Sequence, residues 1–571
     1  GVMRAKAIIT VCLVLCIGIK NSIAQEKIDW EEDLLYAKAY LEIMHPRLFD
    51  FVTEEEFNNE FDYLLNNWQN LNDADIITLI TAIFVKIQDG HTGISLFKSN
   101  DYIKGLFHYY PVWLYRFNDG YFVLYARNEY KELVGKKITR LGNLGICDAI
   151  SRMIRFQTGD NRWGRVQYIP LIHEFMQCAG VIGRESDILV FQYENNKGES
   201  QEFKIERPEA LKDFYFPSKV FPQKDPGVYA MNDTCVKALP LYLSRISEGG
   251  FAGNNYWYTW LPEQGAIYLQ ISNNTDKPDD PFDTFCTRMF HDLDSLNAGK
   301  LIVDVRLNGG GSHFEMPLLK GIIARPDIDS KGNLFLITGR RTISASEHLT
   351  TLMETYTNVV IVGEPTAARP NMSGSITGFT LPNSGLNCFT AKEYIQDSEF
   401  SDFRLTTEPH VFSLLSSDDY KNNDDPVLNA IFNYDSISLL KAECMKDMQA
   451  GYLTDGISGL TAAFHNHKPG CRKAGINFEY LLIDELSGWM YSNRKGKEDY
   501  AAYIRFVADE LPESIRANYW YGRNCQLNDK PDLAKEYYKR CLELNPAHMN
   551  AIKYSKLIDL SEKYDLINYG R

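Results

Sequence analysis

The chain has 571 residues, with 60 Lys and Arg against 75 Asp and Glu, and a net charge of −15. So acidic a chain repels the phosphates of nucleic acid, which argues against DNA or RNA as its partner. Its length is too great for one hydrophobic core and predicts about three or four domains.

The first 24 residues have the features of a secretory signal peptide. A positively charged start, MRAK, precedes a short apolar run, AIITVCLVLCIGI, and the small residues of NSIA favour cleavage after Ala24. The competing interpretation is an uncleaved anchor, for which the apolar run is short. We therefore predict an exported protein, periplasmic or extracellular, with no membrane span after cleavage.

Four regions follow the signal peptide. Residues 25–109 repeat apolar side chains at helical spacing and end in the segment QDGHTGI. Residues 110–217 are rich in strand-like runs such as YFVLYAR and DILVFQYE. Residues 218–434 alternate short apolar strands with helical runs, the pattern of an α/β domain. Residues 435–571 are helical throughout. The fold class predicted is multidomain α/β with an all-α tail.

The helical tail contains a segment similar to a tetratricopeptide repeat. Gly522, Ala534, Tyr538 and Pro546 occupy the positions where such a repeat has small, small, aromatic and helix-ending residues. We expect about two repeats and a final helix. Arrays of this kind present a concave surface, which predicts a protein partner or a second copy of the chain at the tail.

The cysteine and histidine pattern predicts neither a metal nor a cofactor. Nine cysteines remain after the signal peptide, and none has the CxxC spacing of a metal site. An odd number leaves at least one thiol free or paired between chains, and the disulfide pattern stays open. His465 and His467, in HNH, resemble half of a metal site without further ligands near them in the sequence.

Two segments of the α/β region point to chemistry. LIVDVRLNGGGS is a buried strand that runs into three glycines, whose N–H groups suit an anion or an oxyanion, although glycine turns after strands are common. NLFLITGRRTISASEHL places Ser344 and Ser346 where a buried strand turns into a helix. One of these serines is a candidate nucleophile, and no base stands beside it in the sequence.

Together with GEPTAARPNMSGSITGF and EYIQDSEFSDFRL, these segments resemble the C-terminal-processing, or tail-specific, serine peptidases, in particular their tricorn-core-like branch. The resemblance covers almost everything before residue 435 and implies a crotonase-like α/β core in a serine endopeptidase that cleaves proteins or peptides. It assigns Ser344 as the nucleophile and Ser346 as a packing residue, and it implies an oxyanion hole formed by the N–H groups of Gly310 and Ala345.

The base implied by the resemblance is a histidine. Well-known family members use a lysine where this chain has Arg369, and arginine stays protonated and cannot act as a base. We therefore expect Arg369 to bind substrate at most. In the tricorn-like branch the base lies in a segment similar to DGHTGI, which gives His91, with Gly90 in place of the branch's additional serine. The implied acid is Asp402, with Glu399 and Glu408 as substitutes.

Several alternatives accompany this interpretation. His348 lies four residues after Ser344 and is predicted to be structural. The segment YKELVGKKITRLGNLGI is similar to part of a PDZ domain, but an intact peptide groove is doubtful. Two other classes of function stay open: a non-catalytic ligand-binding or protein-binding member of the same fold, and a scaffold that acts through its repeats.

Overall fold

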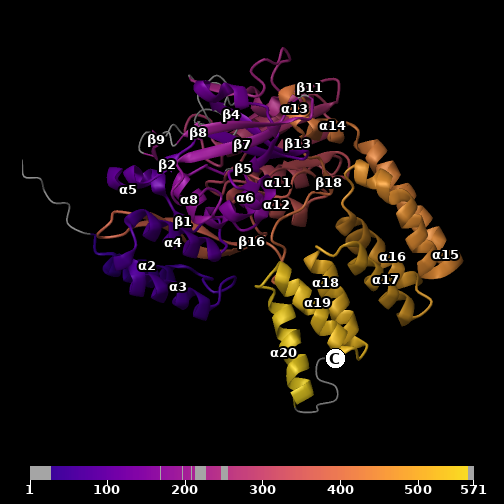
Figure 1. Ribbon diagram of the computed structural model, residues 1–571. Helices are drawn as coiled ribbons and strands as arrows, with labels where there is room; N and C mark the ends of the chain where they lie inside the picture. Colours follow the sequence, from indigo (N-terminus) through magenta and orange to yellow (C-terminus); the bar gives the residue numbers. More distant parts are fainter. Residues whose placement is uncertain are drawn as a thin grey trace, which may run out of the picture.

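The computed structural model describes residues 28–167, 169–195, 197–206, 209–211, 227–245 and 255–563. The predicted signal peptide therefore lies outside the described residues. Among the helices that are described, none combines the length and the apolar character needed to cross a bilayer. Figure 1 shows an α/β body with the helices of the tail grouped along one side of it.

The body is built around a six-stranded sheet in the order β11-β12-β13-β14-β15-β18. The first pair is antiparallel and the other four pairs are parallel. The bounds are β11 (Tyr256–Leu261), β12 (Ala266–Ile271), β13 (Lys300–Asp304), β14 (Leu334–Thr338), β15 (Val360–Gly363) and β18 (Val411–Phe412), with helices α10 (Phe282–Ser295), α11 (Met316–Ile323), α12 (Ala345–Tyr356), α13 (Ser417–Lys421) and α14 (Pro426–Phe432).

Both faces of this sheet are covered, which explains why its central strands are uniformly apolar. On one face, Val303 and Leu336 pack against the apolar sides of α10, α11 and α12. On the other face, Phe335 and Ile337 pack against α14. Strands β13 and β14 are parallel neighbours, so their carboxyl ends meet at one edge of the sheet. The glycine segment follows β13 and the serine segment follows β14 at that edge.

The N-terminal region shares its core with the rest of the body. Its elements are α2 (Trp30–Met44), α3 (Glu54–Asn67), α4 (Asp73–Lys86), the short β1 (Gly93–Ile94) and α5 (Asp101–Leu106). Strand β1 pairs with β17 (Asn387–Gln396), which forms a hairpin with β16 (Asn371–Thr380). One continuous cluster of buried side chains joins α2–α4, the strand-rich region and the tip of that hairpin. The predicted boundary near residue 109 therefore does not separate two cores.

The strand-rich region forms three small sheets, ordered β6-β5-β7-β8, β10-β4-β3 and β2-β9. Leu307 and Tyr420 of the α/β core pack against the second of these sheets, so it is also attached to the body. The bounds are β2 (His108–Tyr109), β3 (Val112–Phe117), β4 (Gly120–Arg127), β5 (Ile138–Leu141), β6 (Leu144–Gly145), α6 (Ile146–Met153), α7 (Arg162–Arg165), α8 (His173–Cys178), β7 (Ile188–Glu194), β8 (Ser200–Glu206), β9 (Glu209–Ala210), β10 (Val228–Ala230) and α9 (Leu241–Ser244).

The tail is a series of antiparallel helices. Its elements are α15 (Tyr434–Lys473), a π-helical segment (Tyr480–Leu486), α16 (Ser487–Asn493), α17 (Lys497–Glu510), α18 (Ile515–Leu527), α19 (Pro531–Leu544) and α20 (Met549–Lys563). Helix α15 is broken at Asp455 and Gly456, so it consists of two helices in sequence. A Cβ at Gly522 would lie 2.9 Å from the ring of Tyr538, which explains the small residue and the aromatic residue at these positions. Cys525 and Cys541 are buried free thiols.

The start of the tail docks directly on the body. Ile476 forms a β-bridge to Val411 of β18, and the Tyr480 ring stacks on His410 with centroids 4.2 Å apart. The far end of the tail also returns to the body, because the Asn545 side chain donates to the carbonyl oxygen of Phe403 at 2.7 Å. The tail is therefore more than an appended array: it covers one edge of the core sheet.

Candidate active site

Ser344 occupies a strained turn between a buried strand and a helix. All five residues of β14 are buried, and α12 begins at Ala345. Ser344 itself has φ 63° and ψ −128°, a conformation that residues with a side chain rarely adopt and that costs about 1–3 kcal/mol. Its side chain is half-buried, and among the described residues its hydroxyl has no hydrogen-bond partner. Residues held in such strained conformations cluster at functional sites, which makes Ser344 a candidate nucleophile.

Ser346 has a different role in the same turn. It is fully buried, and its hydroxyl accepts a hydrogen bond from the Ile343 N–H at 2.9 Å. The same oxygen lies 2.8 Å from the carbonyl oxygens of Asn308 and Ile343, one of which accepts its proton. Ser346 therefore fixes the backbone that carries Ser344, in keeping with the packing role predicted for it.

The glycine loop packs against the nucleophile candidate. Gly310 has φ 94°, and a Cβ there would lie 2.6 Å from Ser344 Cβ and 3.1 Å from its Oγ. The structure differs from the sequence prediction in one respect: the Gly310 N–H donates to Asn308 Oδ1 at 2.8 Å, so in this arrangement it does not face a substrate. The N–H of Ala345 is the first of α12 and has no acceptor within the helix. The oxyanion role of Ala345 stays a prediction.

Replacing Gly310 by alanine tests whether this close approach positions Ser344. We expect Gly310→Ala to destabilise the fold by about 1–3 kcal/mol, because the residue keeps a positive φ and meets Ser344 Cβ. Labelling of Ser344 by a fluorophosphonate should fall with it. Gly309→Ala is the matched control, since a Cβ there would meet only the Arg341 side chain, at 4.0 Å. Equal labelling of both variants would contradict a positioning role for Gly310.

His91 lies in a turn that touches the serine segment. A Cβ at Gly90 would lie 2.8 Å from Ile343 Cδ1, and Ile343 immediately precedes Ser344. His91 is 4% exposed, and its Nδ1 lies 3.6 Å from Asp89 Oδ1 without a hydrogen bond. Burial alone would lower the pKa of His91, but the Asp89 and Asp160 carboxylates raise it above the usual value. No hydrogen bond joins His91 to Ser344 in this structure; catalytic pairs often close only when substrate binds.

Asp89 is the carboxylate beside His91. It accepts hydrogen bonds from His45 Nε2 at 3.0 Å, from the Thr92 hydroxyl at 2.7 Å and from the His91 N–H at 2.9 Å. His45 Nδ1 accepts from the Arg47 N–H, so the proton of the neutral ring sits on Nε2 and points at Asp89. Burial opposes ionisation of Asp89, but its proximity to His45 and His91 lowers its pKa below the usual value. Asp89 was not among the predicted site residues, although it stands two residues before His91 in QDGHTG.

Asp160 ties the histidine turn to a second segment. Its carboxylate accepts from the Gly90 N–H at 2.7 Å and from the Arg369 N–H at 3.1 Å. The Ala367 N–H in turn donates to the carbonyl oxygen of Thr342, in the serine segment. Three stretches far apart in the sequence therefore meet next to Ser344. Asp160 was missed because a single acid in the strand-rich region carries no motif that marks it.

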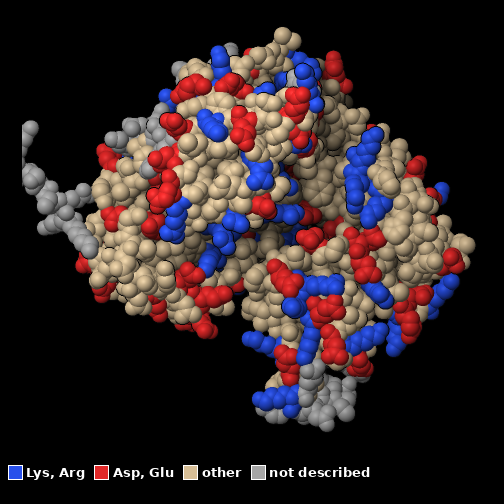
Figure 2. All heavy atoms as spheres, in the orientation of Figure 1, with Lys and Arg blue, Asp and Glu red and all other residues tan. Residues whose placement is uncertain are grey.

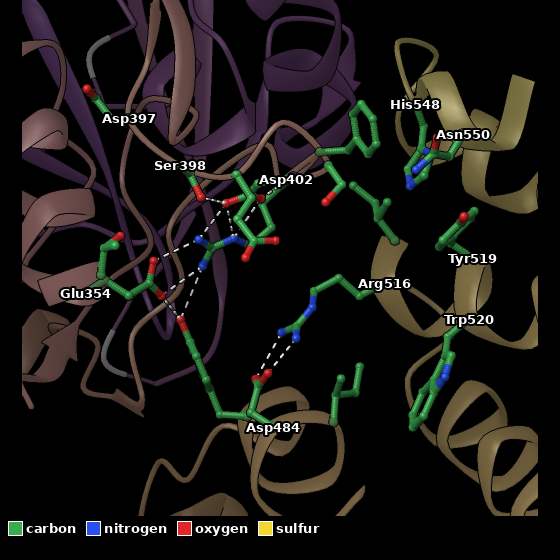
Figure 3. A pocket seen from close by; sticks show the side chains of 18 of the residues that line it. Glu354, Asp397, Ser398, Asp402, Asp484, Arg516, Tyr519, Trp520, His548 and Asn550 are labelled. Atoms are coloured by element: carbon green, nitrogen blue, oxygen red, sulfur yellow. Dashed lines mark hydrogen bonds and ion pairs between the residues drawn. The ribbon is translucent and has the colours of Figure 1, made fainter. Parts of the chain in front are cut away.

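Asp402 does not contact His91. Its carboxylate accepts from the Ser398 hydroxyl at 2.7 Å and from the Arg404 guanidinium at 2.8 Å (Figure 3). Burial opposes its ionisation, but Arg404 lowers the pKa of Asp402 below its ordinary value. Arg404 also pairs with Glu354, so Asp402 belongs to an ion-pair network that faces the tail. The predicted triad role of Asp402 is not met in this arrangement, because a two-residue spacing to Arg404 favours a local ion pair.

The two substitutes for Asp402 do not contact His91 either. Glu408 accepts a hydrogen bond from the Asn477 side chain at 3.1 Å. The backbone carbonyl oxygen of Glu399 accepts a hydrogen bond from the Asp402 N–H at 2.9 Å. Within the described part of the chain, Asp89 is therefore the acid that His91 approaches.

Arg369 is held by the protein itself. Its Nη2 donates to the carbonyl oxygen of Gln88 at 3.1 Å, its Nε lies 3.4 Å from Asp160 Oδ2, and its guanidinium stacks over the Phe51 ring. It also lines a cavity of about 260 Å³ that Asp89 and Asp402 share. The structure therefore gives Arg369 a bracing role between segments, in addition to the substrate contact expected from the sequence.

The ring nitrogens of His348, His465 and His467 pair with acids and not with Ser344. His348 Nε2 lies 2.6 Å from Glu315 Oε1, and its Nδ1 lies 2.6 Å from Asp397 Oδ2. Burial would lower the pKa of His348, but these two carboxylates raise it to about 9. In the tail, His465 pairs with Glu510, whereas His467 pairs with Asp447. The two histidines of HNH therefore do not share a ligand.

Neither a family model nor a curated protein sequence matches the chain. Among the solved structures that it does match is CPAF complexed with lactacystin, at 12% identity over 71% of this chain and 98% of that one, with a TM-score of 0.44. The photosystem II D1 C-terminal processing protease matches at 11% over 71% and 97%, with a TM-score of 0.32. The tricorn protease matches at 14% over 71% and 36%, with a TM-score of 0.31. The function of this chain is therefore inferred from its own residues.

Proposed function

We propose that this chain is an exported serine peptidase that hydrolyses peptide bonds of proteins or peptides. The observation that carries the proposal is the strained Ser344 directly before α12, with its hydroxyl unpaired and the His91 turn packed on the residue before it. Glycine would relieve this strain at no cost in packing, so a serine in this conformation indicates a role for the hydroxyl.

In the proposed mechanism Ser344 Oγ attacks the peptide carbonyl carbon as its proton passes to His91 Nε2. The Nδ1 side of His91 faces Asp89, which stabilises the imidazolium that forms. The Ala345 N–H, at the positive end of α12, stabilises the oxyanion. The C–N bond then breaks, and His91 returns the proton to the leaving amine. A water molecule, deprotonated by His91, then attacks the acyl carbon; the C–Oγ bond breaks as His91 returns the proton to Ser344 Oγ, and the carboxylic acid product leaves.

The tail is proposed to bind protein, either the substrate or a partner. It encloses, with the body, a cavity of about 880 Å³ lined by Arg404, Arg516, Tyr519 and Trp520 among others (Figure 3). Aromatic rings and arginines are the side chains that protein-binding surfaces favour. Acidic and basic side chains are interspersed over the face shown in Figure 2, and a hollow separates the body from the tail there.

A fluorophosphonate probe tests the proposed function without knowledge of the substrate, because only an activated serine reacts at a useful rate. We expect one label per chain, and peptide mapping should place it on Ser344. Labelling should be absent after heat denaturation, since activation depends on the folded turn. An intact chain that stays unlabelled while a known serine peptidase reacts in parallel would rule out the peptidase and favour a binding protein.

A further inference from the structure

A cluster of metal-ligating side chains lies where the segment after the glycine loop meets α12. His313 and Glu315 follow the three glycines, and His348 lies on α12 one turn after Ser344. Ligand atoms of all three side chains lie within 4.8 Å of one another. His348 Nε2 is 2.6 Å from Glu315 Oε1, His313 Nδ1 is 3.5 Å from the same oxygen, and the two imidazole rings lie 4.5 Å apart.

Glu315 supplies the second, independent observation. The residue is 3% exposed, and its other carboxylate oxygen, Oε2, is buried without a hydrogen-bond partner. An ionised oxygen that has lost its water and gained no donor is costly unless a cation accompanies it. No Lys or Arg forms an ion pair with Glu315 among the described residues; the side chains that approach its carboxylate are those of His313 and His348. Both are side chains that bind transition metals.

We propose that His313, Glu315 and His348 bind one zinc-class divalent metal ion. Two imidazole nitrogens and one carboxylate oxygen suit zinc and disfavour magnesium and calcium, which prefer oxygen ligands. Metal bonds of about 2.0–2.1 Å at tetrahedral angles place neighbouring ligand atoms ~3.3 Å apart. The His313–Glu315 pair already has this separation, and the His348–Glu315 pair must open by less than 1 Å. Three protein ligands leave the fourth position to water.

Asp397 contacts the nitrogen of His348 that would not bind the metal. Its carboxylate lies 2.6 Å from His348 Nδ1, on the ring nitrogen that the metal does not use. Figure 3 shows Asp397 directed away from the Asp402 cluster. A metal-bound histidine commonly has a carboxylate on its second nitrogen, which fixes the ring and strengthens the ligand. Because His313 follows Gly310 by three residues, the ion would link the glycine loop to the helix of Ser344.

The test is metal binding by the full chain after dialysis against a chelator. Titration with Zn²⁺ in competition with a chromophoric chelator should show one tight site per chain, and zinc should raise the melting temperature. Co²⁺ in its place should give the visible bands of a tetrahedral nitrogen–oxygen site. His313→Ala should remove the tight site with the fold intact, because the His313 side chain is half-exposed. Asp397→Asn should weaken binding by about 10- to 100-fold.

Two controls separate this site from other ligands. A chain with His465→Ala and His467→Ala should bind zinc as tightly as the parent, because those histidines lie in the tail. Metal binding by the exposed thiols Cys147 and Cys178 would give a sulfur charge-transfer band in the Co²⁺ spectrum. The proposal is wrong if the parent binds no stoichiometric zinc, if that band dominates, or if His313→Ala binds like the parent. The cluster would then be a metal-free ion pair of His348 with two acids.

Discussion

Ser344→Ala is expected to reduce peptide hydrolysis by on the order of 10⁶, the loss seen when a catalytic serine is removed from a peptidase. The melting temperature should change little, because the hydroxyl is half-buried and makes no hydrogen bond in the described structure. Ser344→Gly should be equally inactive and more stable, since glycine adopts φ 63° without strain. Progress curves with a quenched peptide library and thermal melts check both expectations.

Ser346→Ala is the matched control for the nucleophile. Its hydroxyl is buried and bonded to the Ile343 backbone, so its loss should cost about 1–3 kcal/mol of stability. Part of the activity should remain below the melting transition, and Ser344 should still accept the probe. The opposite pattern, an inactive Ser346→Ala beside an active Ser344→Ala, would show that Ser346 is the nucleophile.

The second large effect concerns the base and its acid. His91→Ala and Asp89→Asn are each expected to lower turnover by on the order of 10⁴ or more, as in triads that lose the base or the group orienting it. Asp402→Asn should cost far less, because Asp402 contacts Arg404 and not His91. If Asp402→Asn instead matches His91→Ala while Asp89→Asn stays active, the acid implied by the family resemblance is the correct one and the Asp402–Arg404 pair must break on substrate binding.

The pH profile identifies the base directly. A base acts in its neutral form, so kcat/KM should rise with pH through the pKa of His91 and then hold. The Asp89 and Asp160 carboxylates raise that pKa above the usual value of about 6.5, so the rise should lie above it. Asp89→Asn should move the rise to lower pH, because one of the two charges is gone. A parent profile that is flat from pH 6 to 9 would exclude His91 as the base.

Local sequence determined much of the body and one side of the site. Continuous apolar runs followed by glycine or small residues predict buried parallel strands that end in turns. The two apolar runs that precede NGGGS and ISASE do form such strands, β13 and β14. The choice of Ser344 over Ser346 followed from the family resemblance; in the structure Ser344 is half-buried and Ser346 is buried. Arg369 was excluded as a base by its chemistry alone, since a guanidinium does not lose its proton.

Tertiary structure decided which groups meet. His91 lies beside Asp89 because the two residues share one turn, whereas Asp402 is captured by Arg404 two residues away. The pairing of β1 with β17 belongs to the tertiary structure, as does the packing of the DGHT turn against Ile343. The extent of the hydrophobic cores was also decided by the tertiary structure. One core spans the first two predicted regions and the tip of the β16–β17 hairpin, because strand pairing and packing join residues almost 300 positions apart. The spacing of apolar residues along the sequence predicts which face of a helix or strand is buried, but not which distant element packs on that face. Partners for Asp89, Asp160 and Glu315 were therefore fixed only when the chain folded.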